Sequence, residues 1–156
     1  MVENNQYAIS VPYNKQVACE NISDRAIGYG IKGIKVDGND TFAVYDAVKE
    51  AHDRALNGDG PTLIEAVSYR LTPHSSDDDD STYRSKDEVT TQKSNDGVAK
   101  FKEYLLEQGF LTEKSIEKLE VEIKNELNDA TEYAENAPYA DASTLTKYVY
   151  AEKEDF

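Results

Sequence analysis

The first half of the chain alternates between strand-like and helix-like hydrophobic patterns. Thr62–Arg70 is mostly apolar, with several β-branched and aromatic side chains, which predicts a largely buried strand. Ile31–Val36 predicts a shorter strand, closed by the turn signal Asp37-Gly38-Asn39. Between them, Asp40 is a typical N-cap for a helix over roughly Thr41–Leu56. A strand, a helix and a strand in this order predict a βαβ crossover, and therefore an α/β fold with a parallel sheet flanked by helices.

Helical periodicity also indicates the inner faces of three helices. In the helix over residues 41–56, spacings of four, three and four predict one apolar stripe, made of Val44, Val48, Ala51 and Ala55. Asp96 is expected to cap a second helix, over about Gly97–Gln108, with three inward residues: Val98, Phe101 and Leu105. Thr112 is expected to cap a third, longer amphipathic helix, which Pro138 ends.

The remaining segments give weaker signals. Ser23 is a possible N-cap for a short helix, which the glycines of Gly28-Tyr29-Gly30 would stop. Residues 75–96 are polar throughout, so we expect a mobile loop with a short helical turn near Lys86–Thr90. Ser143–Tyr150 is a last apolar and aromatic segment before an acidic tail.

Composition narrows the classes of partner. The chain has 156 residues and a formal charge of −14, which disfavours a phosphate backbone and therefore a nucleic-acid partner. A basic surface on another protein would match better, although the favoured interpretation is that the acidity only maintains solubility. Cys19 is the single cysteine, so an intramolecular disulfide is impossible. With no signal-peptide pattern and no long apolar run, we expect a cytoplasmic protein without a membrane segment.

His74 is the first candidate for chemistry. Pro73 ends the predicted strand, so His74 lies just past its carboxyl end, where open α/β sheets place their ligand crevice. There it could act as a general acid or base, or donate to a phosphate; a plain surface histidine is the alternative. His52, in the predicted helix, is expected to be solvated.

Two polar runs are weaker candidates. The amide oxygens of Asn4-Asn5 suit Mg²⁺, but the pair taken by itself favours a plain turn. Asp77–Asp80 is contiguous, whereas a calcium loop needs alternate ligands, so a solvated loop held by Arg70 and Arg84 is favoured. Phosphorylation of the neighbouring serines would add charge beside four aspartates and disorder this loop.

Five motifs follow one another along the chain: Asn4-Asn5-Gln-Tyr-Ala-Ile-Ser, Arg25-Ala-Ile-Gly-Tyr-Gly, Val36-Asp-Gly-Asn-Asp-x-x-Ala-Val-Tyr45, Gly60-Pro-Thr-Leu-Ile-Glu65 and Tyr69-Arg-x-x-x-His-Ser-x-x-Asp-Asp…Tyr83-Arg84. In this order and spacing they resemble one enzyme family, the alpha subunits of thiamine-diphosphate-dependent 2-oxo acid dehydrogenases. The resemblance extends over nearly the whole chain. The stretch Leu71-Thr-Pro-His-Ser-Ser-Asp-Asp-Asp-Asp80 is most similar to the bacterial branched-chain (2-oxoisovalerate) type.

The resemblance implies roles for individual residues. Asn5 would give its side-chain oxygen to Mg²⁺, and Tyr7 its backbone carbonyl. His74 would contact the diphosphate of the cofactor and assist acyl transfer to the lipoyl group. Ser75 corresponds to a serine that mitochondrial relatives phosphorylate. Together with four further residues it would order the lipoyl-facing loop: Arg70, Asp78, Tyr83 and Arg84.

The resemblance also implies partners. The diphosphate motif of the family opens with Gly-Asp-Gly and closes with Asn-Asn, and this chain holds only the close. We therefore expect the C-terminal half of an alpha subunit, inactive by itself. The family assembles as two alpha and two beta chains, with an activating glutamate from the beta subunit and a lipoyl-bearing acyltransferase as acceptor.

On this basis three parts are expected. Residues 1–72 would be the C-terminal portion of the thiamine-diphosphate-binding domain, 73–96 a loop facing cofactor and lipoyl group, and 97–156 a C-terminal helical segment. A pyruvate or acetoin dehydrogenase alpha subunit is the alternative within the class. A non-catalytic interaction module is the alternative outside it.

Overall fold

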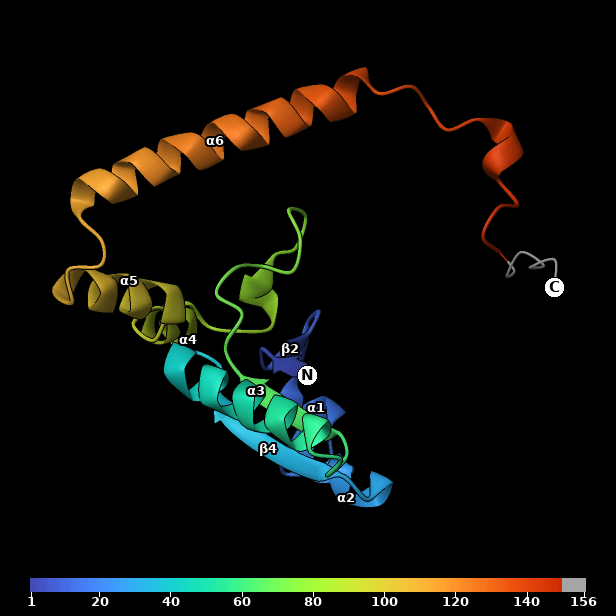
Figure 1. Cartoon of the computed structure of the whole chain (residues 1–156), viewed down its shortest axis with the longest axis vertical. Helices are drawn as coiled ribbons and strands as arrows, with labels where there is room; N and C mark the ends of the chain where they lie inside the picture. Colours follow the sequence, from blue (N-terminus) through green and yellow to red (C-terminus); the bar gives the residue numbers. More distant parts are fainter. Residues whose placement is uncertain (150–156) are drawn as a thin grey trace. The chain divides into compact units, whose positions relative to one another are not determined.

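A three-stranded parallel sheet forms the centre of the first of two units in the computed structural model, which describes residues 1–149 (Figure 1). The strand order is β1 (Val2–Asn4), β5 (Thr62–Val67), β4 (Lys32–Asp37). Val2 pairs with Glu65, and Lys32 pairs with Thr62. The middle of the central strand is buried, which places the core around β5. The predicted parallel α/β sheet is therefore confirmed.

The βαβ crossover consists of β4, α3 (Thr41–Leu56) and β5, and α3 packs on both strands (Figure 1). Asp40 caps the helix by accepting bonds from two backbone N–H groups, as predicted. The predicted apolar stripe was wrong in part, because Val48 is 43% exposed and Ala55 is exposed. Ala47 is buried instead, since its small side chain allows α3 to approach the sheet.

The predicted strand over Thr62–Arg70 ends earlier than expected. After Val67 the chain stays beside the first strand without a regular ladder: Ser68 N–H donates to the Asn4 carbonyl at 2.9 Å and Arg70 N–H to the Asn5 carbonyl at 3.2 Å. These two bonds hold the predicted site segments next to each other.

Short elements connect β1 to β4. They are the hairpin β2 (Tyr7–Ala8) and β3 (Val11–Pro12), α1 (Tyr13–Gln16), the 3₁₀ turn η1 (Ile22–Arg25) and α2 (Ala26–Tyr29). The helical start lies at Asn21, not at Ser23 as predicted, because Asn21 and Asp24 form a reciprocal capping box. Gly30 ends α2 with a φ of 68°, as its position in the sequence indicated.

The region expected to be a polar loop contains regular structure. It holds the 3₁₀ turn η2 (Asp80–Thr82) and α4 (Lys86–Lys93), which is longer than the turn predicted there. α5 (Gly97–Glu107) begins at its predicted cap Asp96. Val98 was wrongly expected to face inward: it is 80% exposed, whereas Phe101 and Leu105 are half-buried.

The second unit begins at Gly109 and consists mainly of α6 (Glu113–Asn136), followed by η3 (Ala142–Thr144). Thr112 caps α6 in a capping box with Ser115. α6 was predicted to be amphipathic, and several of its apolar residues are exposed in this chain, including Leu119, Ile123 and Leu127. Tyr150, the end of the last predicted apolar segment, lies outside the described residues. None of the helices within residues 1–149 is long and apolar enough to cross a membrane.

Candidate cofactor and metal site

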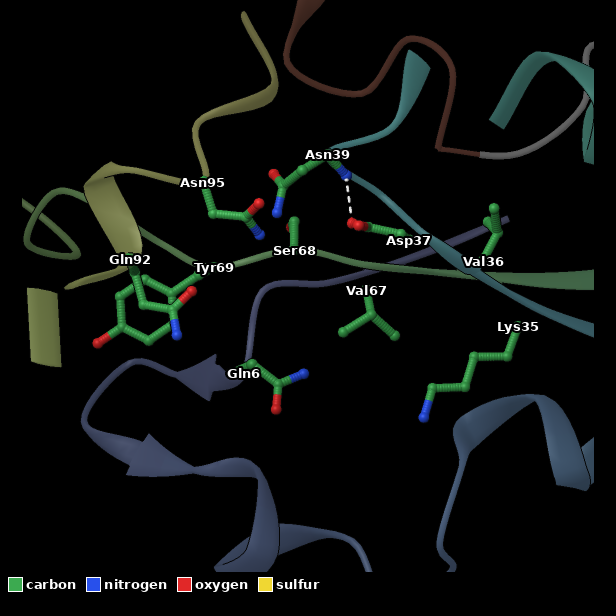
Figure 2. A pocket seen from close by; sticks show the side chains of 10 residues that line it. All are labelled: Gln6, Lys35, Val36, Asp37, Asn39, Val67, Ser68, Tyr69, Gln92 and Asn95. Atoms are coloured by element: carbon green, nitrogen blue, oxygen red, sulfur yellow. Dashed lines mark hydrogen bonds between the residues drawn. The ribbon is translucent and has the colours of Figure 1, made fainter. Parts of the chain in front are cut away.

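The carboxyl ends of the three parallel strands meet at one edge of the sheet, where open α/β sheets bind ligands. A cavity of about 560 Å³ with many polar side chains lies at this edge (Figure 2). Asn39, Ser68 and Asn95 line one part of it and Gln6 another. Asn5, Tyr7 and His74 do not line this cavity. The first two border a smaller hollow of about 170 Å³ at the start of the chain.

Asn5 and Gln6 form a tight turn between β1 and β2, and Tyr7 is the first residue of β2. Asn5 Oδ1 accepts a hydrogen bond from the Tyr7 backbone N–H at 3.2 Å, and Asn4 Oδ1 accepts one from Gln6 N–H at 3.2 Å. Gln6 has a φ of 72°, in the left-handed region that residues other than glycine rarely adopt. The two successive side-chain bonds hold the backbone in this uncommon conformation.

The Tyr7 carbonyl is left outside the hairpin ladder. Tyr7 lies opposite Pro12, which has no N–H, and Tyr13 N–H donates to the Gln6 carbonyl at 2.8 Å. Because bonded and non-bonded pairs alternate in an antiparallel ladder, Tyr7 and Pro12 form a non-hydrogen-bonded pair. In a regular ladder the polar groups of such a residue point away from the partner strand, and the Tyr7 N–H indeed donates to Asn5 Oδ1 within its own turn. An amide oxygen and a backbone carbonyl oxygen are the kinds of ligand that suit a hard cation such as Mg²⁺.

A buried carboxylate holds this turn from the inside. Glu65, in the central strand, is 1% exposed and accepts bonds from Asn4 Nδ2 at 2.7 Å and from Ser23 N–H at 2.9 Å. Because Asn4 directly precedes Asn5, the first bond fixes the start of the turn. Sequence reasoning did not assign Glu65 a place in the site, although an acid inside an apolar strand is a signal that buried donors face it.

The Tyr7 side chain lies in a cluster of rings and cations. Its ring meets the Tyr69 ring edge-on with centroids 5.9 Å apart, and Arg70 and Arg84 lie 5.5 and 5.6 Å from its centroid. Glu88 Oε1 accepts the Tyr7 hydroxyl at 2.8 Å and the Tyr69 hydroxyl at 2.7 Å. Burial, followed by the bond to Glu88, raises the pKa of Tyr7, so this hydroxyl stays protonated and continues to donate.

Arg84 joins the cluster to the predicted lipoyl-facing loop. Its fully buried side chain donates to Asp80 Oδ2 from Nε at 2.9 Å and from a terminal nitrogen at 2.6 Å. It also donates to the Thr72 carbonyl at 2.9 Å and to the Arg70 carbonyl. One guanidinium thus binds both ends of the loop that contains His74. Such fork-like contacts combine strength with fixed geometry.

A second path of bonds reaches His74 itself. Arg70 donates to the Tyr83 hydroxyl at 2.9 Å and to the Ile9 carbonyl at 2.6 Å. The Tyr83 hydroxyl donates to Asp78, whose Oδ2 also accepts the His74 backbone N–H at 2.8 Å. The Tyr83 hydroxyl, and after it the His74 N–H, lowers the pKa of Asp78 below its usual range.

The His74 side chain, at the tip of this loop, is much less constrained than the His74 backbone. His74 is exposed, and within residues 1–149 its imidazole has no hydrogen-bond partner. Ser75 beside it is exposed as well. The structure therefore fixes the backbone of His74 while leaving its ring accessible to a ligand. His52, in α3, is exposed and contacts Asp53 at 3.3 Å, as expected of a solvated helix residue.

Three residues of the aspartate run make internal contacts. Asp78 binds Tyr83, Asp79 caps η2, and Asp80 binds Arg84. Among the described residues, no group of three or more histidine, cysteine or acidic side chains could hold a metal ion. The turn at Asn5 is of another kind, since it offers one amide and one carbonyl oxygen.

Comparison with known proteins identifies the family to which this chain belongs. The dehydrogenase E1 component family matches residues 1–143. The chain is 59% identical over 151 residues to the 2-oxoisovalerate dehydrogenase subunit alpha of Bacillus subtilis, covering 97% of this chain and 46% of that subunit. It is 43% identical to the 3-methyl-2-oxobutanoate dehydrogenase subunit alpha of Mycobacterium tuberculosis, covering 97% of this chain and 41% of that subunit. It is 42% identical to the pyruvate dehydrogenase E1 component subunit alpha of Acholeplasma laidlawii, covering 97% of this chain and 45% of that subunit.

The chain thus spans less than half the length of these curated relatives. The family match extends over the Asn4-Asn5 turn, the sheet and the His74 loop alike. The resemblance carried by the five motifs is confirmed: the chain belongs to the dehydrogenase E1 component family.

Proposed function

We propose that this chain is part of the alpha subunit of a thiamine-diphosphate-dependent enzyme that oxidatively decarboxylates branched-chain 2-oxo acids. The observation that carries the substrate class is the 59% identity to a 2-oxoisovalerate dehydrogenase subunit, against 42% and 40% to pyruvate dehydrogenase subunits. The 43% identity to a second branched-chain subunit does not discriminate by itself.

In this proposal Asn5 and Tyr7 hold Mg²⁺ through the Asn5 side-chain oxygen and the Tyr7 carbonyl. Two observations support this role: the Asn5 side-chain oxygen is bound to the Tyr7 backbone, and Tyr7 is paired with Pro12, which has no N–H to offer the Tyr7 carbonyl. Two oxygens fill only part of an octahedral shell. We expect the remaining ligands to come from cofactor phosphates, water and residues outside this chain.

His74 is the proposed catalytic residue of the chain. Thiamine diphosphate would supply the carbanion-stabilising chemistry, and the protein would supply orientation and charge. His74 would donate a hydrogen bond to the cofactor diphosphate and assist acyl transfer to a lipoyl group. The bound backbone and accessible imidazole of His74 support this role, because the ring can meet a large incoming partner without unfolding the loop.

The partners in this proposal are a beta subunit, in an assembly of two alpha and two beta chains, and a lipoyl-bearing acyltransferase. We expect the isolated chain to be inactive. The predicted cofactor site needs groups from outside residues 1–156, and the activating glutamate would come from the beta subunit.

Substrate kinetics of the assembled enzyme test the proposed substrate class. We expect kcat/KM for 3-methyl-2-oxobutanoate to exceed that for pyruvate by at least about tenfold, the ratio that one or two extra methyl groups in an apolar pocket provide. Equal values, or a preference for pyruvate, would replace the branched-chain proposal with the pyruvate alternative.

A matched pair of histidine variants tests the proposed role of His74. His74→Asn should lower lipoyl acyl transfer by roughly 10²- to 10⁴-fold, the range for loss of a positioned acid or base. His52→Asn, which changes the other exposed histidine, should leave transfer unchanged. Full transfer activity in His74→Asn would remove His74 from the chemistry.

A further inference from the structure

Glu88 is held both through its backbone N–H and through its side-chain carboxylate. It is the third residue of α4, and its backbone N–H donates to Ser85 Oγ at 3.1 Å. The spacing of Ser85 and Glu88 would allow a capping box, in which the Glu88 carboxylate reaches back to the Ser85 N–H. The Glu88 Oε1 instead accepts hydroxyl bonds from Tyr7 and Tyr69, residues 81 and 19 positions away in the chain.

The two tyrosines differ in what they adjoin. Tyr7 provides the carbonyl oxygen proposed to face Mg²⁺, and its N–H binds Asn5 Oδ1. Tyr69 follows the central strand, on the path to the His74 loop. A carboxylate that accepts from both rings therefore fastens α4 to the metal-facing turn. Hydrogen bonds to a carboxylate are stronger than bonds between neutral groups.

We propose that Glu88 is a positioning residue for the metal-binding turn: by holding the Tyr7 hydroxyl, its carboxylate sets the orientation of the Tyr7 backbone and of the oxygen offered to the cation. This inference rests on the proposed function, since it requires that the turn binds Mg²⁺. Glu88 itself does not touch the metal. Its effect should therefore appear in metal affinity, in the range typical of residues that orient ligands.

The experiment measures Mn²⁺ binding to the assembled enzyme in the presence of thiamine diphosphate, from the electron paramagnetic resonance signal of unbound Mn²⁺. Glu88→Ala should weaken Mn²⁺ binding roughly tenfold. Glu88→Gln keeps an acceptor oxygen and should recover most of that loss. Asp87→Ala is the matched control: it removes a neighbouring charge from the same first turn of α4 and should bind Mn²⁺ as the unchanged protein does.

Two phenylalanine variants separate positioning from general stability. Tyr7→Phe and Tyr69→Phe each remove one hydroxyl bond to the same Glu88 oxygen. Tyr7→Phe should weaken Mn²⁺ binding, and combining it with Glu88→Ala should add little, because both delete one contact. Tyr69→Phe should lower the urea midpoint with little effect on Mn²⁺. This pair also gives the answer if Glu88→Ala fails to fold.

Asn5→Ala distinguishes failure of this inference from failure of the proposed function. If Asn5→Ala weakens Mn²⁺ binding and folded Glu88→Ala or Tyr7→Phe does not, the positioning role of Glu88 is overturned and the metal site stands. If Asn5→Ala binds Mn²⁺ normally, the proposed metal site itself is wrong. Equal losses in Glu88→Ala and Asp87→Ala would reduce Glu88 to a general charge effect and also overturn the inference.

Discussion

The Asn5–Tyr7 turn and the tip of the His74 loop both belong to the proposed site, but the turn is held by many more contacts than the tip. The turn is held by Glu65 from inside, by its own side-chain bonds and by the Tyr7 cluster. At the loop tip only the His74 backbone is held, through Asp78, while the imidazole is exposed. Ligand oxygens for a small cation need a fixed geometry, whereas a group that meets a mobile partner needs access.

The two regions are nevertheless connected. Arg84 lies over the Tyr7 ring and also donates to two carbonyls and to Asp80 at the ends of the loop. Arg70 lies over the same ring and reaches Tyr83. The fixed turn therefore serves as the anchor for the loop, and changes near the anchor should have larger effects on stability than changes at the tip.

Arg84→Ala should be the most disruptive change to this anchor. It would leave the Asp80 carboxylate and two carbonyls without their donor, at a cost of about 1–3 kcal/mol of unfolding free energy for each polar group that stays buried without a partner. Urea unfolding measures the loss. Lys102→Ala, an exposed cation on α5, is the control and should change little. A loss below about 1 kcal/mol for Arg84→Ala would mean that the loop does not depend on its buried guanidinium.

Glu65→Gln should have the next largest effect. The amide keeps one acceptor oxygen but turns a donor group towards Asn4 or Ser23, so one buried donor loses its partner at about 1–3 kcal/mol. The unfolding free energy in urea would report this. Glu3→Gln, on an exposed position of β1, is the matched substitution and should be neutral. Equal stability of the two variants would argue against Glu65 as the inner anchor of the turn.

Asp78 makes the attachment of the loop tip sensitive to acid. Because its pKa is lowered in the folded protein, Asp78 stabilises the fold at every pH above the usual aspartate value near ~4, and this contribution is lost as the pH falls through the lowered value. Asp78→Asn should therefore have a lower urea midpoint than the unchanged protein at neutral pH and an equal one in strong acid. Asp77→Asn is the neighbouring control. A constant difference across the pH range would contradict the assignment.

His74→Asn should have the smallest effect on stability, within about 0.5 kcal/mol, because the exposed imidazole contacts nothing that the fold needs. His52→Asn should match it. If His74→Asn keeps its stability but loses acyl transfer, the tip of the loop serves function and not folding. A large destabilisation in His74→Asn alone would show that the ring is packed in solution, and the contrast between the two regions would then be wrong.

The elements predicted best from the sequence are those that depend on local signals. α3 has its predicted bounds because an aspartate cap and a glycine-rich stop each act within a few residues. The face that α3 buries was predicted less well. Residues 44, 48, 51 and 55 and residues 44, 47 and 51 are both compatible with helical spacing, and only the packed sheet selects Ala47.

The candidate site shows the same division. Asn5, Tyr7 and His74 were assigned from motifs that lie in continuous stretches of sequence. Glu65 and Glu88 were not, because their donors lie 42, 61 and 81 residues away in the chain, and no periodic pattern reports such a distance. The polar loop prediction failed to include a full α4 for a related reason: the tyrosines that bind Glu88 come from other elements.

Calorimetric titration of thiamine diphosphate with Mg²⁺ into the assembled enzyme tests most directly whether the Asn5–Tyr7 turn is a metal site. Asn5→Ala would be compared with Asn14→Ala, which changes an exposed asparagine of α1. We predict that Asn5→Ala weakens binding by at least about tenfold and that Asn14→Ala does not, because the Asn5 side-chain oxygen is the one bound to the backbone of Tyr7. Equal affinity in the two variants would contradict the account.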